Sequence, residues 1–286
     1  VGELEDLMFG IINTTRDAMR IKAAYVGDFK SGAILCPVVE PSEKEPFRSL
    51  TVKWMATEFT SKSSKSRDYV CVEATDILSL ENDVRIGYHV LHSIEFPQTK
   101  PLSFFNRGNI SIVGVYRPIH SRIVDTFGLY IIEPGHEVKR QQLLPAAVNS
   151  VLAVTNYVRC GQLKKVAWML QRQRAGYKQG CDNQHGRGCV VCGKNKSIAG
   201  LGRSTCKLCD GDVCYSCKVR ERMFFVGHDN ELVQRSMSFC SHCMSKAINC
   251  NTKQAAQDQA TEYHDSYDSA STFSESMFTT LSETSL

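Results

Sequence analysis

The sequence predicts an α+β protein in two parts, a curved antiparallel sheet packed against a long helix and a small cysteine-rich module after it. Three observations lead to this fold class. At least six strand-like segments follow one another with no helical segment between them, which is typical of an antiparallel sheet. A long helical pattern follows from about Leu144 to Gln173, and four Cys-x2-Cys pairs lie beyond it.

The first 26 residues are expected to form two helices. Leu4, Leu7 and Met8 begin an apolar repeat at helical spacing, and Asn13-Thr14-Thr15 interrupts it. The pattern resumes at Arg16, where Thr15 is placed to cap the second helix.

Strand patterns begin after Gly32. Apolar and polar residues alternate, as in Leu50, Val52 and Trp54 on one face of a segment. The six predicted strands are Ala33–Val39, Leu50–Met55, Tyr69–Ala74, Arg85–Phe96, Ile110–Arg117 and Ile123–Ile132.

The long helix is expected to bury one apolar stripe against the sheet. Its members are Val148, Val151, Leu152, Thr155, Val158, Leu163, Val166, Ala167 and Leu170. A sheet that curves around a single helix leaves a space between them. That space is either a ligand cavity or packed core.

Residues 1 to about 174 resemble the START family in the order of their elements. Arg67-Asp68-Tyr69-Val70 is similar to the family's strand opening, Leu50–Trp54 to the strand before it, and Ile131–Gly135 to the strand end before the last helix. The resemblance implies a helix-grip fold with a lipid in its cavity. START domains begin with a further helix and early strands, so we expect this domain, residues 1–174, to be truncated at its N-terminus.

Motifs typical of enzymes do not occur in this part of the sequence. There is no Gly-x-Ser-x-Gly, His-Glu-x-x-His or Gly-x-Gly-x-x-Gly, and His89, His92 and His120 have no evident partner. We therefore expect no catalysis. Some charged residues alternate with apolar neighbours and are candidates to point inward, where each would need a partner or a ligand headgroup. They are Arg67, Asp68, Arg85, Glu95 and Arg117.

The four Cys-x2-Cys pairs predict two structural zinc sites. The pairs are Cys189 and Cys192, Cys206 and Cys209, Cys214 and Cys217, and Cys240 and Cys243. A two-residue gap lets both thiolates face one ion, and zinc accepts four sulfurs tetrahedrally with no position left open for chemistry. A disulfide framework is the alternative, but adjacent pairs in a chain with scattered unpaired cysteines fit a reducing cytoplasm and metal binding better.

The spacing of the pairs resembles the FYVE family over about residues 180–247. Four residues separate Cys209 from Cys214, whereas RING domains leave two there and PHD fingers place a histidine at the position of Cys214. The resemblance implies interleaved pairing, with Cys189, Cys192, Cys214 and Cys217 on one zinc and Cys206, Cys209, Cys240 and Cys243 on the other. Spacing alone also allows sequential pairing.

The FYVE motif that binds phosphatidylinositol 3-phosphate is only partly present. Of its basic run, Arg203 remains and Lys207 replaces the last arginine, while both histidines are missing. The resemblance implies that Arg203 and Lys207 contact an anionic headgroup. Lysine lacks the bidentate grip of arginine, which weakens the case for that particular lipid.

The remaining segments are expected to lie outside folded domains. Residues 175–188 are glycine-rich and read as a linker before the finger at 189–247, and residues 251–286 are polar and read as a disordered tail. A net charge of +4 does not by itself indicate nucleic acid, and no apolar run is long enough to span a membrane.

Taken together, these features favour a cytoplasmic, non-enzymatic lipid-binding protein. Its START-like half would hold a lipid, and the finger would dock on an acidic membrane, such as the endosomal surface, or on a protein there. The alternative is a protein-interaction scaffold whose zinc finger has lost phosphoinositide binding.

Overall fold

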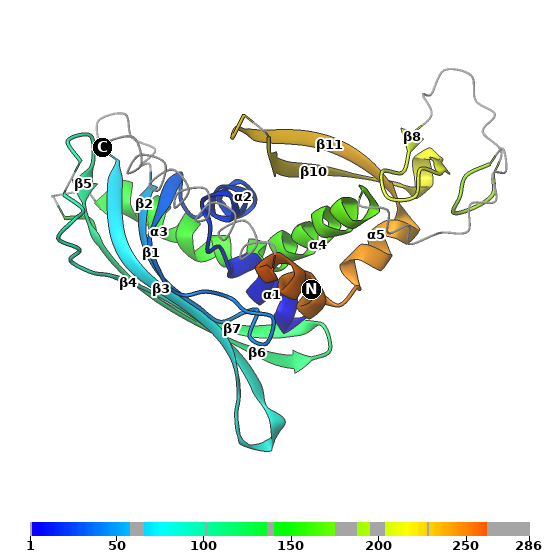
Figure 1. Ribbon diagram of the computed structural model, residues 1–286. Coiled ribbons are helices and arrows are strands. Elements are labelled where there is room, and N and C mark those ends of the chain that lie inside the picture. Colours follow the sequence, from blue (N-terminus) through cyan, green and yellow to red (C-terminus); the bar gives the residue numbers. More distant parts are fainter. Residues whose placement is uncertain are drawn as a thin grey trace, which may run out of the picture.

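A computed structural model describes residues 2–57, 66–100, 102–135, 140–174, 188–194, 204–227 and 229–261. Within these residues, a curved sheet carries helices on one face, and a smaller cysteine-rich module packs on the far side of those helices (Figure 1). The predicted linker, residues 175–188, lies outside the described residues except for Gly188.

Two short helices open the chain, as the sequence predicts. They are α1 (Leu4–Ile11) and α2 (Arg16–Val26). The Thr15 hydroxyl accepts a hydrogen bond from Ala18 N at 3.2 Å, which satisfies one of the free donors at the start of α2. Gly27 ends α2 in the left-handed region at φ 75°.

The main sheet contains all six predicted strands, in the order β1-β2-β3-β4-β6-β7, with antiparallel neighbours throughout. A two-residue strand, β5, adds to β3 in parallel, and a short 3-10 turn, η1, precedes β4. The bounds are β1 (Ser31–Val39), β2 (Ser49–Thr57), β3 (Arg67–Ser79), η1 (Glu81–Asp83), β4 (Arg85–Ser93), β5 (Asn106–Arg107), β6 (Asn109–His120) and β7 (Ile123–Glu133).

The register of the sheet decides which side chains face the helices. Thr51 of β2 pairs with Glu73 of β3. Because side chains alternate between the two faces of a strand, Thr51, Lys53 and Glu73 lie on the same face of the sheet. Lys53 and Glu73 on this face are buried, because the helices cover it. Leu50, Val52 and Trp54 consequently lie on the opposite face.

The predicted long helix is two helices joined by a 3-10 turn. The helices are α3 (Arg140–Ala153) and α4 (Tyr157–Arg174), and the turn between them is η2 (Val154–Asn156). The predicted stripe is correct in α4, where Leu163, Val166 and Leu170 are buried. It is wrong in α3, where Val148 and Leu152 are about half exposed. The difference arises because α4 is covered by α1 and by the cysteine-rich module.

Helices α1 and α4 approach each other backbone to backbone. A Cβ atom added at Gly10 would lie 1.9 Å from the Tyr157 carbonyl oxygen, and one added at Gly161 would lie 1.9 Å from the Asp6 carbonyl oxygen. Only glycine fits at these two positions. This contact fixes the direction in which α4 leaves the sheet.

The cysteine-rich module comprises β8 (Ser204–Thr205), β9 (Asp212–Val213), η3 (Tyr215–Cys217), β10 (Lys218–Val226), β11 (Leu232–Cys240) and α5 (Ser241–Ile248). Strands β10 and β11 form a hairpin that extends along α4 and α2 (Figure 1). Met223 and Phe239 of this hairpin are fully buried in one cluster with Val166 and Leu170 of α4. The module therefore shares its core with α4.

The expectation of disorder from residue 251 onward is wrong for residues 252–261, which form a helix. Ala255 and Ala256 of this helix are buried in a cluster with Phe9 and Phe47. Small alanine side chains let the helix lie close to α1. The overall polar composition of the segment does not reveal this small apolar face. Residues 262–286 lie outside the described residues.

Candidate metal centres and a buried polar cavity

The structure gathers the eight paired cysteines into two groups of four. Within each group all four sulfur atoms lie within 4.8 Å of one another. This interleaved grouping is the one that the FYVE resemblance implies, and it excludes sequential pairing. We call them the outer group (Cys189, Cys192, Cys214 and Cys217) and the inner group (Cys206, Cys209, Cys240 and Cys243).

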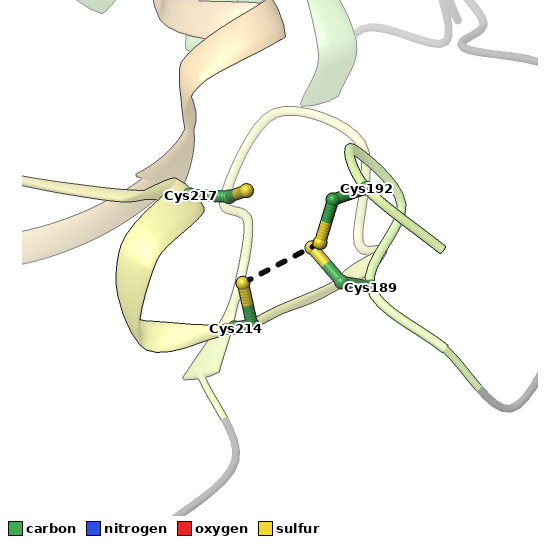
Figure 2. Close-up of side chains that lie close together, drawn as sticks. All are labelled: Cys189, Cys192, Cys214 and Cys217. Atoms are coloured by element: carbon green, nitrogen blue, oxygen red, sulfur yellow. Dashed lines mark hydrogen bonds between the residues drawn. The ribbon is translucent and has the colours of Figure 1, made fainter. Parts of the chain in front are cut away.

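The outer group has a geometry that fits a tetrahedral ion. Figure 2 shows its four thiols pointing toward a common centre from two knuckles. The Sγ atoms of Cys192 and Cys214 are 3.7 Å apart. Four sulfurs at about 2.3 Å from a tetrahedral zinc ion lie about 3.8 Å apart, whereas a disulfide would place them at about 2 Å. The donor set and the spacing are thus compatible with zinc.

The inner group is buried, and backbone donors support its sulfurs. Cys243 N donates to Cys240 Sγ at 3.2 Å, and Leu208 N donates to Cys206 Sγ at 3.4 Å. A hydrogen bond from the Cys243 thiol, together with backbone N–H groups, lowers the pKa of the Cys206 thiol to about 5 despite its burial. Zinc binds the thiolate form, so such donors favour the metal-bound state.

Of the two predicted headgroup residues, the structure describes Lys207 alone. Lys207 is exposed on the knuckle between Cys206 and Cys209, and its backbone N–H donates to Ser238 O at 3.0 Å. Arg203 lies outside the described residues. Contact of these two residues with an anionic headgroup therefore stays a prediction.

A cavity of about 430 Å³ lies between the covered face of the sheet and helices α2 and α3. Part of its wall is apolar, with Met55, Leu91, Ile110, Ile112 and Ile132 among its members. A polar part is formed by Lys22, Asp28, Glu73 and His89, and three tyrosines, Tyr69, Tyr130 and Tyr157, also line it.

The polar part of the wall is a network of buried charges centred on Glu73. Its carboxylate pairs with Lys53 and lies 2.9 Å from His89 Nε2, while Lys22 Nζ is 3.9 Å away. Lys22 also pairs with Asp28 at 3.0 Å. The two lysines and two carboxylates balance in charge, as buried ions require.

The electrostatics of this network keep Glu73 ionised. Burial alone would raise the pKa of Glu73, but Lys53, Lys22 and His89 together hold it well below its ordinary value. Burial lowers the pKa of Lys53, and Glu73 opposes that effect. Oδ1 of Asp28 is buried and has no hydrogen-bond partner among the described residues, so one acceptor in the wall is free.

The sequence pattern predicted a different set of charged residues as candidates to point into the protein interior. Arg67 and Asp68 are buried, but they bond to Pro134 O and Arg107 respectively and do not line the cavity. The other three candidates, Arg85, Glu95 and Arg117, are exposed. The network itself was missed. The sequence did contain a usable signal. Lys53 in β2 and Glu73 in β3 each stand between two apolar residues, so each side chain points to the face opposite its apolar neighbours.

His89 was expected to lack a partner, and in the structure it has one. Its Nε2 atom bonds to Glu73, and its ring packs edge to face against that of Tyr157, with 6.4 Å between the ring centroids. Sequence could not pair it with Glu73, because that needs the register of β3 against β4.

Comparisons with known proteins give matches among solved structures. No family model matches the sequence, and no curated protein does. Among solved structures, the fold is similar to human StAR-related lipid transfer protein 5, with 12% identity and a TM-score of 0.40 over 56% of this chain and 71% of that one. It is also similar to human STARD10, with 12% identity and a TM-score of 0.42 over 62% of this chain and 64% of that one. Likeness at this level does not identify a ligand.

Among the helices of the described residues, none combines the length and apolar character that a membrane span requires.

Proposed function

We propose that this chain is a non-catalytic lipid-binding protein stabilised by two zinc ions. Residues 1–174 would form a START-like domain that holds one lipid, and the FYVE-related finger at 189–247 would dock on an acidic membrane surface. The observation that carries the proposal is the cavity of about 430 Å³, which is partly apolar and has a polar network on one wall.

The size and lining of the cavity support a small amphiphilic ligand. Binding pockets for such ligands are typically about 300–1,000 Å³, mostly apolar, with a few polar groups that set orientation. Ile110, Ile112 and Ile132 supply an apolar wall, and the free Oδ1 atom of Asp28 supplies an acceptor. Because the network is balanced in charge, a ligand with a neutral hydroxyl or amide donor suits it better than one with a net charge.

The exposed surface of the finger supports contact with a membrane. Tyr215 is 79% exposed, and Val190 and Val191 are also exposed on the outer group's knuckles. The Lys218 ammonium lies 5.5 Å from the centre of the Tyr215 ring. Aromatic side chains next to cations suit the boundary between lipid headgroups and acyl chains. Both cysteine groups are closed by four sulfurs, so a bound zinc would have no open position for catalysis.

The lipid half of the proposal is tested by two neighbouring substitutions in β6. Ile112→Trp projects into the cavity, whereas Val113→Trp lies on the opposite face of the sheet. In native mass spectra of a chain whose second cavity, at Ala167 of α4, is filled by Ala167→Phe, the chain should carry a bound lipid, which should remain with Val113→Trp and be lost with Ile112→Trp. If the unaltered chain carries no lipid from the cell extract or from added vesicles, the scaffold alternative is favoured.

The membrane half is tested by flotation with vesicles that contain anionic lipid. Binding should be strongest at low salt, where surface charges are least screened, and should fall when Tyr215 is replaced by Ser. Equal flotation with neutral and anionic vesicles, or no change on Tyr215→Ser, would contradict this docking mode.

A further inference from the structure

A second cavity lies where the two parts of the chain meet. This interdomain groove, of about 440 Å³, is lined by α1, α2, α4, the β10 strand of the finger and the helix of residues 252–261. Its wall is largely aromatic and apolar, and includes Phe9, Tyr25, Trp168 and Phe225. It shares no lining residue with the sheet cavity.

Specific contacts hold the walls of the groove in place. Phe224 N donates to the Tyr25 hydroxyl at 3.0 Å, and the two rings pack edge to face at 4.9 Å. At the tip of the hairpin, Arg20 donates to Asn230 O at 2.7 Å. On the other side, Trp168 Nε1 donates to Asp258 Oδ2 at 3.0 Å, which fixes the helix of residues 252–261. The elements that form the walls of the groove are therefore held to one another by hydrogen bonds and aromatic contacts.

One cation, Lys164, lines this apolar groove. Its ammonium lies 4.1 Å from the centre of the Phe9 ring and donates to Phe9 O at 2.8 Å and Ile12 O at 3.2 Å. An ammonium group has three donors, so these two carbonyls leave one. None of the ion pairs found among the described residues includes Lys164. Burial lowers its pKa to about 8, as expected for a cation that lacks an anion.

The acidic residue that lines the groove does not neutralise Lys164. Asp17 has a side chain that is 52% exposed, and it forms an ion pair with Arg20 at 3.9 Å. It lies at the solvent side, while Lys164 lies against α1. The groove thus has an apolar wall with one half-buried cation that has no counter-charge.

We propose that the interdomain groove binds a single-chain carboxylate, such as a fatty acid, with its carboxylate at Lys164 and its chain against Trp168 and Phe225. A carboxylate brings one negative charge to one ammonium, whereas a phosphate monoester would bring nearly two. The acyl chain would cover the aromatic wall between the finger and α4. Such a ligand would stabilise the contact between the two parts, and its binding does not depend on a lipid in the sheet cavity.

Trp168 makes the proposal directly measurable. The chain has two tryptophans, Trp54 and Trp168, and Trp54 lines neither cavity. In a Trp54→Phe background, 12-bromododecanoate should quench Trp168 emission saturably, because bromine quenches only on close approach. The uncharged 12-bromododecanol should bind at least tenfold more weakly.

Two matched substitutions separate this groove from the sheet cavity. Ala167→Phe should fill the groove and abolish quenching, whereas Ile112→Phe in the sheet cavity should leave it unchanged. Lys164→Met should remove the preference for the acid over the alcohol. Should that variant fail to retain zinc or to fold, the comparison of acid with alcohol on the unaltered chain still decides the point.

Three results would overturn the inference. These are no quenching of Trp168 by the acid, equal binding of acid and alcohol, or quenching that survives Ala167→Phe and is lost in Ile112→Phe. The last result would assign the acid to the sheet cavity and leave the proposed function intact. Conversely, native mass spectra of Ala167→Phe, in which the groove is filled, report on the sheet cavity alone, and absence of a lipid there would contradict the proposed function and leave the groove unaffected.

Discussion

The outer and inner cysteine groups have the same donors and the same spacing within each pair, but their surroundings differ. All four cysteines of the inner group are buried, whereas Cys192 of the outer group is exposed and Cys214 and Cys217 are half-buried. All four inner cysteines belong to one buried core with Val166 and Leu170 of α4, whereas of the outer group only Cys189 does, with Cys214 and Cys217 at the edge of that core. The outer group joins two knuckles at the end of the finger that is remote from the sheet (Figure 1).

Because the two cysteine groups differ in burial, a metal bound in each would stabilise a different part of the chain. A metal in the inner group would hold the base of the β10–β11 hairpin and α5 against α4, and so would support the part of the chain that contains the sheet as well. A metal in the outer group would stabilise mainly the loops that carry it, including the exposed Tyr215, at the edge of that core. The following predictions test how far each group's influence extends.

The largest effect is expected from Cys206→Ala in the inner group. Structural zinc contributes on the order of 10–16 kcal/mol, which exceeds the stability of most domains. The finger should unfold and uncover α4, and because Trp168 lies on α4 its emission should shift to the red. Zinc content and thermal unfolding measure this, with Cys36→Ala, outside both groups, as the control.

The same substitution in the outer group should act locally. Cys192→Ala should release one zinc ion, while Trp168 emission and the unfolding temperature of the sheet stay close to those of the unaltered chain. Hydrogen exchange should rise around Cys189 and Cys214 and stay low in β10. Equal global unfolding in both variants would show that the two groups form one cooperative unit.

A buried ion pair next to the inner group gives the next largest effect. Lys165 Nζ lies 2.7 Å from Asp6 Oδ1 of α1, and it also donates to Cys250 O and to the Thr252 hydroxyl, just after α5. Lys165→Ala leaves Asp6 buried without its partner, which typically costs about 3–5 kcal/mol.

Denaturant unfolding should show this loss in both parts of the chain, because Lys165 joins α1 to the end of the finger. Combining Asp6→Asn with Lys165→Met removes both charges and should recover much of the stability. A loss confined to zinc release, with the sheet unaffected, would mean that this pair does not couple the two parts.

The same contrast shows what sequence could predict. The strand patterns between residues 33 and 132 and the Cys-x2-Cys pairs depend on local spacing, and both correctly indicated the sheet and the cysteine groups. What was missed depends on tertiary contacts. Lys53, Glu73 and His89 meet only through the register of β2, β3 and β4, which no single segment reveals.

The helix of residues 252–261 was missed for a related reason. Its polar composition predicts disorder, but Ala255, Ala256 and Ala260 form a narrow face that fits beside α1. Whether so small an apolar face can hold a helix in place depends on the surface against which it packs. That surface belongs to another part of the chain, so the sequence of the segment does not reveal it. The exposed stripe of α3 is the converse case, since its apolar face has less cover than periodicity suggests.

Acid should destabilise the sheet and the finger at different pH values, because the sheet contains the buried charged network and the finger contains the cysteine groups. Glu73 has a folded pKa well below its ordinary value of 4.5, so its charge stabilises the fold above that pH. This stability is lost only as the pH falls through the lowered pKa. Zinc thiolates bind protons in competition with the metal, so zinc release should begin at higher pH.

A pH titration that follows zinc release and circular dichroism together should therefore resolve two transitions. Glu73→Gln should lower the free energy of unfolding at neutral pH by about 3 kcal/mol, since Lys53 and Lys22 lose their carboxylate. The difference between the two chains should shrink as the pH falls below 4.5. A constant difference across the titration would mean that Glu73 is not ionised in the fold.

The smallest effect concerns the exposed side of the inner group. Lys207 lies on its first knuckle, but its side chain faces solvent, so its replacement should not disturb the core. Near an anionic membrane one basic residue contributes about 1 kcal/mol, so Lys207→Gln should weaken vesicle binding about fivefold at low salt and leave zinc content unchanged. Lys44→Gln makes the same charge change at an exposed position in the part that contains the sheet and should have no effect. If both variants weaken binding equally, attraction follows net charge, and the finger has no preferred docking face.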